Sequence, residues 1–176
     1  MYSYWINYLY WRSFVLLRFH IFARWFGAAA ILRMLGAEVG RDTTIAPDIR
    51  IQNARRGRCS SLHIGGHVYI GPRCLFELAS EITVEGETVL SADVSIITHV
   101  DMGSGPLKER FPRKEGPVII RKGAWLGVKT TVLHGVEIGE YAVIGAMSLV
   151  NKDVPANSLC YGIPCKVIKR FDGPPN

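Results

Sequence analysis

Aliphatic residues recur at every sixth position near the C-terminal end of the chain. Six successive positions of this kind are Ile120, Leu126, Val132, Ile138, Ile144 and Val150. The fourth residue after each is small or β-branched, and these residues are Ala124, Thr130, Val136, Ala142, Ser148 and Val154. A period of six fits neither the 3.6-residue period of a helix nor the two-residue period of a plain strand. The pattern therefore predicts short strands that are joined by tight corners.

The same register continues upstream, with interruptions. It passes through Val39, Ile45, Ile51, Ile64, Ile70, Phe76, Val84, Leu90 and Ile96. Extra residues lie between Ile51 and Ile64, between Phe76 and Val84, and between Ile96 and Ile120, and we interpret them as loops that leave the repeat. The fifteen aliphatic or aromatic positions predict about five coils of three strands each.

In such a coil each side places one large apolar residue in the interior, and each strand pairs with the strand of the next coil about 4.8 Å away. Burial of each such residue contributes roughly 1.5 to 3 kcal/mol before entropy is counted. Glycine follows several of these positions directly, as in Gly65, Gly71, Gly127, Gly139 and Gly145. It supplies either a positive φ or a close approach of the backbone at the corners. We therefore expect an all-β parallel β-helix over residues 38–154, with an excursion loop over 98–117.

Both ends of a β-helix expose unpaired strand edges that need a cover. We expect the aromatic, helical N-terminal segment 1–37 and the C-terminal tail 155–176 to supply it. Residues 13–32 are apolar, but Arg18, His20 and Arg24 interrupt them and disfavour a membrane-spanning helix. Residues 1–30 either make peripheral contact with a membrane or pack against the protein, and both interpretations remain open.

The composition adds few constraints. The formal charge of +6 is dispersed along the chain and does not identify a partner, and we expect no nucleic-acid binding. The four cysteines contain no Cys-x-x-Cys pair, which favours reduced thiols in a cytoplasmic protein and no disulfide. His63 and His67 are four residues apart, a spacing that does not place them on one face of a six-residue repeat. We therefore expect no metal site.

The C-terminal repeats resemble a known family. The most specific pieces are Trp125-Leu126-Gly127, Ile144-Gly145-Ala146-x-Ser148, Lys152-Asp153-Val154-Pro155 and Gly162-Ile163-Pro164-Cys165-Lys166. They resemble the hexapeptide-repeat acyltransferases, in particular the maltose and galactoside O-acetyltransferases and the O-acetyltransferases of polysaccharide biosynthesis. The resemblance implies a left-handed β-helix, a homotrimer with acetyl-CoA in grooves between subunits, and a catalytic histidine at the start of the excursion loop. Glu85 and Arg121 depart from the pattern, because glycine often stands at these positions.

By its place in the sequence, His99 is the expected catalytic base. An alcohol is protonated at neutral pH, so a base within hydrogen-bond reach accelerates its attack on a thioester by about 10² to 10⁴. Asp101 is the expected partner of the imidazolium. The resemblance implies that the backbone amide of Val128 donates to the oxyanion.

The resemblance also implies binding residues. Trp125 would flank the sugar acceptor, unless it packs between subunits, and Glu77 would reach the acceptor. The coenzyme-binding residues would be Gly127, Gly145 and Ala146 beside the pantetheine arm and Lys152, Lys166 and Lys169 at the phosphates.

The expected function is acetyl-CoA-dependent acetylation of a hydroxyl on a sugar or polysaccharide. Two alternatives remain open, namely N-acetylation of an amino sugar and a noncatalytic β-helix scaffold. The excursion loop carries Lys108, Arg110, Arg113 and Lys114 against two glutamates. Three interpretations of this loop remain open: it covers a neighbouring active site, it selects an anionic acceptor, or it is simply solvated.

Overall fold

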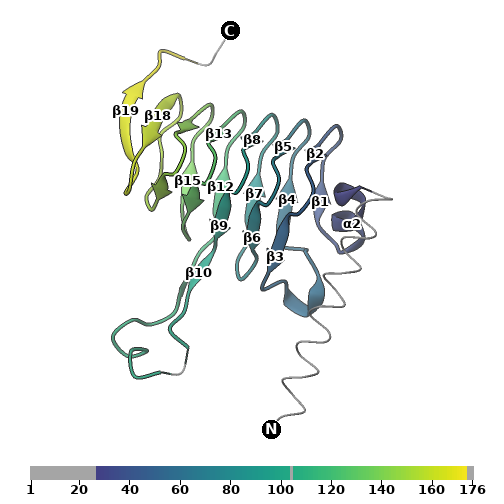
Figure 1. Ribbon diagram of the computed structural model, residues 1–176, viewed down its shortest axis with the longest axis vertical. Coiled ribbons are helices and arrows are strands. Elements are labelled where there is room, and N and C mark those ends of the chain that lie inside the picture. The colour runs from purple at the N-terminus through teal and green to yellow at the C-terminus, as the bar shows by residue number, and fades with distance from the viewer. Residues whose placement is uncertain (1–26, 104, 174–176) are drawn as a thin grey trace.

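The short strands of the chain stack into three parallel sheets that form the walls of a prism (Figure 1). The computed structural model describes residues 27–103 and 105–173. The first wall contains β1 (Glu38–Val39), β4 (Leu62–Ile64), β7 (Ile82–Val84), β12 (Val118–Ile120) and β15 (Glu137–Ile138). The second contains β2 (Thr44–Ile45), β5 (Tyr69–Ile70), β8 (Val89–Leu90), β13 (Trp125–Leu126), β16 (Val143–Ile144), β18 (Ser158–Tyr161) and β19 (Lys166–Arg170). The third contains β3 (Arg50–Gln52), β6 (Leu75–Glu77), β9 (Ser95–Ile97), β14 (Thr131–Val132) and β17 (Leu149–Val150).

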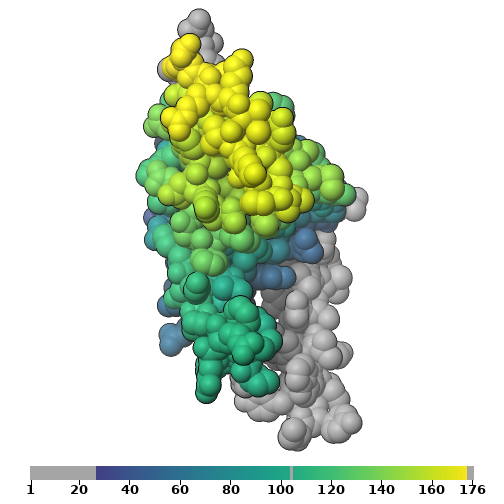
Figure 2. Space-filling model, turned by 90° about the vertical axis from the view of Figure 1, so that its left-hand side faces the viewer, coloured from purple at the N-terminus to yellow at the C-terminus, as the bar shows by residue number. Residues whose placement is uncertain are grey.

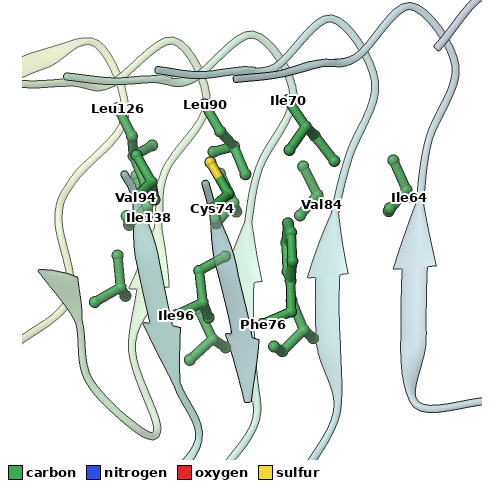
Figure 3. Packing of buried hydrophobic residues seen from close by; sticks show 14 of the residues in the cluster. Ile64, Ile70, Cys74, Phe76, Val84, Leu90, Val94, Ile96, Leu126 and Ile138 are labelled. Atoms are coloured by element: carbon green, nitrogen blue, oxygen red, sulfur yellow. The ribbon is translucent and has the colours of Figure 1, made fainter. Parts of the chain in front are cut away.

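The predicted interior positions form the core. From Ile64 onward, every one of them has at most 3% of its surface exposed, and they stack in columns inside the prism (Figure 3). The three positions of the first coil, Val39, Ile45 and Ile51, are only partly buried and pack against that core. The pairing keeps each column in register, as between Phe76 and Ile96 in the third wall. The prediction of a five-coil parallel β-helix is thus confirmed.

The corners show which of the two glycine roles applies. The glycines that directly follow interior positions do not have positive φ, but a Cβ on Gly127 would lie 2.6 Å from the backbone nitrogen of Ala146 in the next coil. The positive φ falls instead on the third residue after an interior position, as at Arg73, Asp93 and Lys129. Glycine is therefore needed here for close stacking of coils.

The two departures from the glycine pattern are explained by an ion-pair ladder on the first wall. Arg121 lies 2.8 Å from a carboxylate oxygen of Glu85 in the coil below and 2.8 Å from one of Glu137 in the coil above. Glu85 also accepts a hydrogen bond from the backbone of Lys122 at 2.9 Å. These partly exposed side chains bridge successive coils.

The two ends of the prism are covered differently. Helix α2 (Ala28–Met34) packs against the first coil, where its Leu32 is fully buried. At the other end, β18 and β19 form an antiparallel hairpin that continues the second wall. The proposed interfacial segment lies almost wholly outside the described residues. Among residues 27–103 and 105–173, no helix has the length and apolar character needed to cross a membrane.

The cysteine prediction is wrong in one respect. Cys160 and Cys165 form a disulfide, whereas Cys59 and Cys74 are free and buried. The tight β18–β19 turn brings the two Cα atoms within 5.9 Å, a proximity that the spacing of cysteines along the chain does not reveal.

Two excursions leave the prism on the side of the third wall (Figure 1). The first follows β3 and contains the short 3-10 helix η1 (Arg55–Gly57). The second follows β9 and is a long hairpin that begins with the antiparallel pair β10 (His99–Val100) and β11 (Lys114–Glu115). Figure 2 shows this hairpin projecting away from the body of the molecule.

Candidate active site

His99 stands where the third wall gives way to the long hairpin. It is the first residue of β10 and pairs with Glu115 of β11, which fixes its backbone beside the edge of the prism. Its side chain is 20% exposed. Within the described part of the chain, its Nε2 atom has no polar partner, so this nitrogen is free to act on a ligand.

The other ring nitrogen of His99 faces a buried carboxylate. Nδ1 lies 2.8 Å from Oε2 of Glu77, whose side chain is only 4% exposed. The oxygen stands off the line of the ring N–H, so the contact is a close polar approach and not a linear hydrogen bond. The backbone register explains the proximity, because Glu77 pairs with Ile97, two residues before His99.

Three further groups hold the Glu77 carboxylate. Asn53 donates to Oε1 at 2.6 Å, and the backbone amide of Ala79 donates to the same oxygen at 3.0 Å. Thr98 donates to Oε2 through its amide at 3.0 Å, and its hydroxyl shares one proton between Oε2 at 2.8 Å and the backbone carbonyl of Glu77 at 2.7 Å. Both oxygens are thus fully engaged by donors, and the position of the carboxylate is determined by groups from three coils.

This environment keeps Glu77 ionised. Burial alone would raise its pKa, but the close approach of His99 and the hydrogen bonds from Asn53 and Thr98 outweigh burial and lower the pKa to about 2. At neutral pH the site therefore presents a fixed negative charge to Nδ1 of His99.

The structure places Glu77 differently from the expected contact with the acceptor. Its carboxylate is buried and saturated with protein donors, so no oxygen is left for a sugar hydroxyl. Its position suits orientation of His99. The clue in the sequence was the register, since Phe76 and Ile96 occupy the same interior column and therefore bring Glu77 to the level of Ile97.

Asp101 does not reach the imidazole as expected. Its carboxylate accepts a hydrogen bond from the amide of Gly103 at 2.8 Å and pairs with Arg113 at 3.1 Å. These interactions lower its pKa and tie the two sides of the hairpin together. The residue that contacts His99 is therefore Glu77, from the preceding coil, and Asp101 has a role in the loop.

The other residues expected around the reacting atoms lie on the coil after His99. Trp125 belongs to the second wall, is 52% exposed, and donates from its indole nitrogen to the hydroxyl of Ser91 at 3.1 Å. Val128 is 42% exposed at the corner between the second and third walls. Its amide donates to no other backbone group in the described ranges, which leaves it available to a ligand.

The expected coenzyme residues cluster toward the C-terminal coils. Gly127 and Gly145 lack the room for a side chain, because a Cβ on Gly145 would lie 2.7 Å from Cβ of Tyr161. Ala146 is exposed beside them. Lys152, Lys166 and Lys169 are also exposed, and none of the three is in an ion pair among the residues that the structure describes.

The histidines that were considered as metal ligands lie elsewhere. His63 on the first wall contacts Glu38 at 2.8 Å and Glu81 at 3.4 Å, and His67 lies at a corner. Across residues 27–103 and 105–173, no group of three or more histidine, cysteine or acidic side chains is arranged to hold a metal.

Comparisons with known proteins agree with this architecture. The family described as bacterial transferase hexapeptide (six repeats) matches residues 117–152. WcaF of Escherichia coli strain K12, which is named as a colanic acid biosynthesis acetyltransferase, is 31% identical over 147 residues, covering 83% of this chain and 75% of WcaF. A protein of Staphylococcus aureus strain COL that is named as an acetyltransferase is 34% identical over 112 residues, which is 64% of this chain. The chain spans 56% of the length of that relative.

Solved structures show the same fold. A maltose O-acetyltransferase from Clostridium difficile 630 superposes with a TM-score of 0.73 at 25% identity, covering 90% of this chain and 89% of that one. A hexapeptide-repeat acetyltransferase of Vibrio cholerae, solved in complex with acetyl coenzyme A, superposes with a TM-score of 0.73 at 22% identity, covering 83% and 77%. The fold is the left-handed parallel β-helix expected from the sequence. The chain belongs to the hexapeptide-repeat acetyltransferase family.

Proposed function

We propose that the protein is an acetyl-CoA-dependent O-acetyltransferase that acts on a sugar or polysaccharide hydroxyl, with His99 as the general base. The observation that carries this proposal is the pairing of His99 with Glu77. At the start of β10, a side chain that is 20% exposed presents one free imidazole nitrogen, and a buried carboxylate lies 2.8 Å from the other. The names of WcaF and the maltose O-acetyltransferase support the same chemistry.

In this mechanism Nε2 of His99 accepts the proton of the acceptor hydroxyl as its oxygen attacks the acetyl carbonyl. The carboxylate of Glu77 stabilises the imidazolium and keeps the ring oriented, so Glu77 is a positioning residue. The amide of Val128 donates to the carbonyl oxygen as negative charge develops there. The imidazolium then returns its proton to the leaving sulfur, which regenerates neutral His99.

Acetyl-CoA supplies the acetyl group, and the described residues fit it. Gly127 and Gly145 let successive coils stack closely beside exposed Ala146, where the pantetheine arm is expected. Exposed Lys152 and Lys166 lie at the C-terminal end, where cationic side chains suit the phosphates. The acetyl coenzyme A complex of the Vibrio cholerae protein supports this assignment.

The active form in this proposal is a homotrimer with its sites between subunits. Trp125 belongs to the second wall and His99 follows the third, so the prism directs them to different sides. The outer face of the second wall also carries an apolar row in register, Tyr69, Val89, Trp125, Val143 and Leu159. A neighbouring subunit would cover this row and place its own Trp125 near His99.

The proposal is tested with His99→Ala. We expect turnover of acetyl-CoA with a sugar acceptor to fall by about 10² or more, while affinity for CoA and the oligomeric state stay unchanged. His67→Ala is the matched control, because His67 is 69% exposed at a distant corner. Release of CoA, followed with a thiol reagent, measures the rate, and light scattering measures the mass.

The choice of acceptors separates the alternatives. Transfer to hydroxyl sugars supports O-acetylation, whereas transfer confined to amino sugars would favour N-acetylation by the same base. Retention of full activity by His99→Ala would remove His99 from the base role. Absence of CoA binding would favour a noncatalytic scaffold.

A further inference from the structure

Cationic side chains without acidic partners gather on the first excursion. The segment from Gln52 to Ser61 contains Arg55, Arg56 and Arg58 and no acidic residue. All three arginines are exposed, and none of them is in an ion pair within the described residues. Exposed guanidinium groups of this kind are the usual ligands of carboxylates and phosphates.

This excursion is attached directly to the His99 network. Asn53, which begins it, donates to the Glu77 carboxylate at 2.6 Å, and Glu77 in turn lies 2.8 Å from His99. The charge of one arginine also acts on the hairpin that carries His99. The pKa of Glu115, the strand partner of His99, is lowered mainly by its hydrogen bond with Arg113, and the charge of Arg55 adds to this lowering.

The hairpin contributes further cations. Lys108, Arg110 and Lys114 are exposed, and no ion pair is seen for them in the ranges that the structure describes. Arg113 is different, because Asp101 at 3.1 Å and Glu115 at 2.8 Å already neutralise it. Among the described hairpin side chains that make no ion pair, only Glu109 is acidic, so the unpaired charge on the two excursions is mainly positive.

These cations lie far along the prism from the lysines that are expected to bind the coenzyme phosphates. The first excursion leaves the prism after β3 in the first coil, and His99 follows β9 in the third coil. Lys152 and Lys166 follow β17 and open β19, beyond the fifth coil (Figure 1). Along the prism, therefore, the arginines and these lysines lie on opposite sides of His99.

We propose that Arg55, Arg56 and Arg58, with Lys114 of the hairpin, form a subsite for an acidic group of the acceptor, so that the natural acceptor is an anionic glycan. This inference rests on the proposed function and specifies its substrate class. The subsite holds the carboxylate or phosphate of the sugar while a neighbouring hydroxyl faces Nε2 of His99. The coenzyme phosphates occupy the opposite end and do not compete for it.

The experiment compares two acceptors that differ in one group. These are p-nitrophenyl β-D-glucuronide and p-nitrophenyl β-D-glucoside, which share the secondary hydroxyls of the ring and differ at C6, where the first has a carboxylate and the second a hydroxymethyl group. We expect the wild-type protein to favour the glucuronide in kcat/KM. In the double variant Arg55→Gln/Arg56→Gln, we expect the KM for the glucuronide to rise about tenfold or more, with kcat for the glucoside and KM for acetyl-CoA unchanged.

The control is Arg41→Gln/Arg50→Gln, which removes the same charge from exposed positions of the same coil outside the excursion. It should retain the preference for the glucuronide. Equal kcat/KM for the two acceptors, or a preference that survives in Arg55→Gln/Arg56→Gln, would overturn the proposal. A rise in the KM for acetyl-CoA would instead assign the arginines to the coenzyme.

Direct binding keeps the test decisive if neither acceptor is turned over. Calorimetry with tetragalacturonate and with neutral maltotetraose, on the full-length protein, reports the subsite without catalysis. Binding of tetragalacturonate that is lost in Arg55→Gln/Arg56→Gln supports the subsite even if acetyl transfer fails. Absence of any tetragalacturonate binding refutes it, whereas absence of transfer to every acceptor refutes the proposed function.

Discussion

Replacement of Glu77 by glutamine is the most informative single change in the site. Every polar neighbour of the two carboxylate oxygens is a hydrogen-bond donor. These neighbours are Asn53, Ala79, Thr98 and His99. A glutamine amide in either orientation would turn its NH₂ group toward some of these donors. The substitution therefore removes the charge and also creates an unfavourable donor–donor contact.

The magnitude follows from the pKa of Glu77. Its value is lowered from 4.5 to about 2, and one pH unit corresponds to about 1.4 kcal/mol, so the ionised carboxylate contributes about 3 kcal/mol to the free energy of unfolding. The folded pKa lies below the unfolded one. The contribution is therefore complete above a pH of about 4.5 and is lost as the pH falls through about 2.

The assay is urea denaturation followed by circular dichroism at equal protomer concentration. At about pH 7, we expect Glu77→Gln to lower the free energy of unfolding by about 3 kcal/mol. At about pH 3, the difference from the wild-type protein should be clearly smaller. The matched control is Glu81→Gln, since Glu81 is 58% exposed, and it should change stability by less than about 0.5 kcal/mol.

Two results would refute this reasoning. One is a Glu77→Gln protein that is as stable as the wild type at neutral pH. This result would mean that the donors around residue 77 form hydrogen bonds with water in the variant. The other is a loss of stability that is the same at both pH values, which would mean that packing and not charge explains the effect.

Two further changes test the stacking of coils and the core. Gly127→Ala places a Cβ 2.6 Å from the backbone of Ala146, so we expect a loss of roughly 1 to 3 kcal/mol in urea denaturation, whereas Gly105→Ala, with its nearest atom 4.0 Å away, should be nearly neutral. Phe76→Ala empties a fully buried position and should cost about 3 to 5 kcal/mol, whereas Phe111→Ala, 54% exposed on the hairpin, should cost less than about 0.5 kcal/mol. Equal effects within either pair would contradict the assigned packing.

The fold was predictable because each coil repeats the same local constraints. An apolar residue at every sixth position specifies one interior contact per strand, and the third residue after it turns the corner. The disulfide between Cys160 and Cys165 was not predictable in this way. It depends on the turn between β18 and β19, which follows the last coil and has no repeat to specify it.

The site was predictable to the extent that its residues belong to the coils. His99 follows the interior position Ile96, and the column below it contains Phe76, so counting the register would have identified Glu77 as the neighbour of His99. The choice of Asp101 relied on sequence distance alone. The side chains of residues two apart at the base of a hairpin need not be in contact. The Asp101 carboxylate instead forms an ion pair with Arg113, which lies on the returning side of the hairpin.

Asn53 shows why the rest of the site depends on tertiary structure. Its side chain reaches Glu77 because the chain leaves β3 with a positive φ at Asn53 and then forms η1, a conformation that no period specifies. The same departure carries the three arginines out of the first coil. A single irregular segment therefore both holds the carboxylate that orients His99 and provides the charge proposed to select the acceptor. If this coupling is correct, Asn53→Ala should weaken two properties together, the turnover supported by His99 and the preference for the glucuronide, whereas Arg55→Gln/Arg56→Gln should weaken only the second.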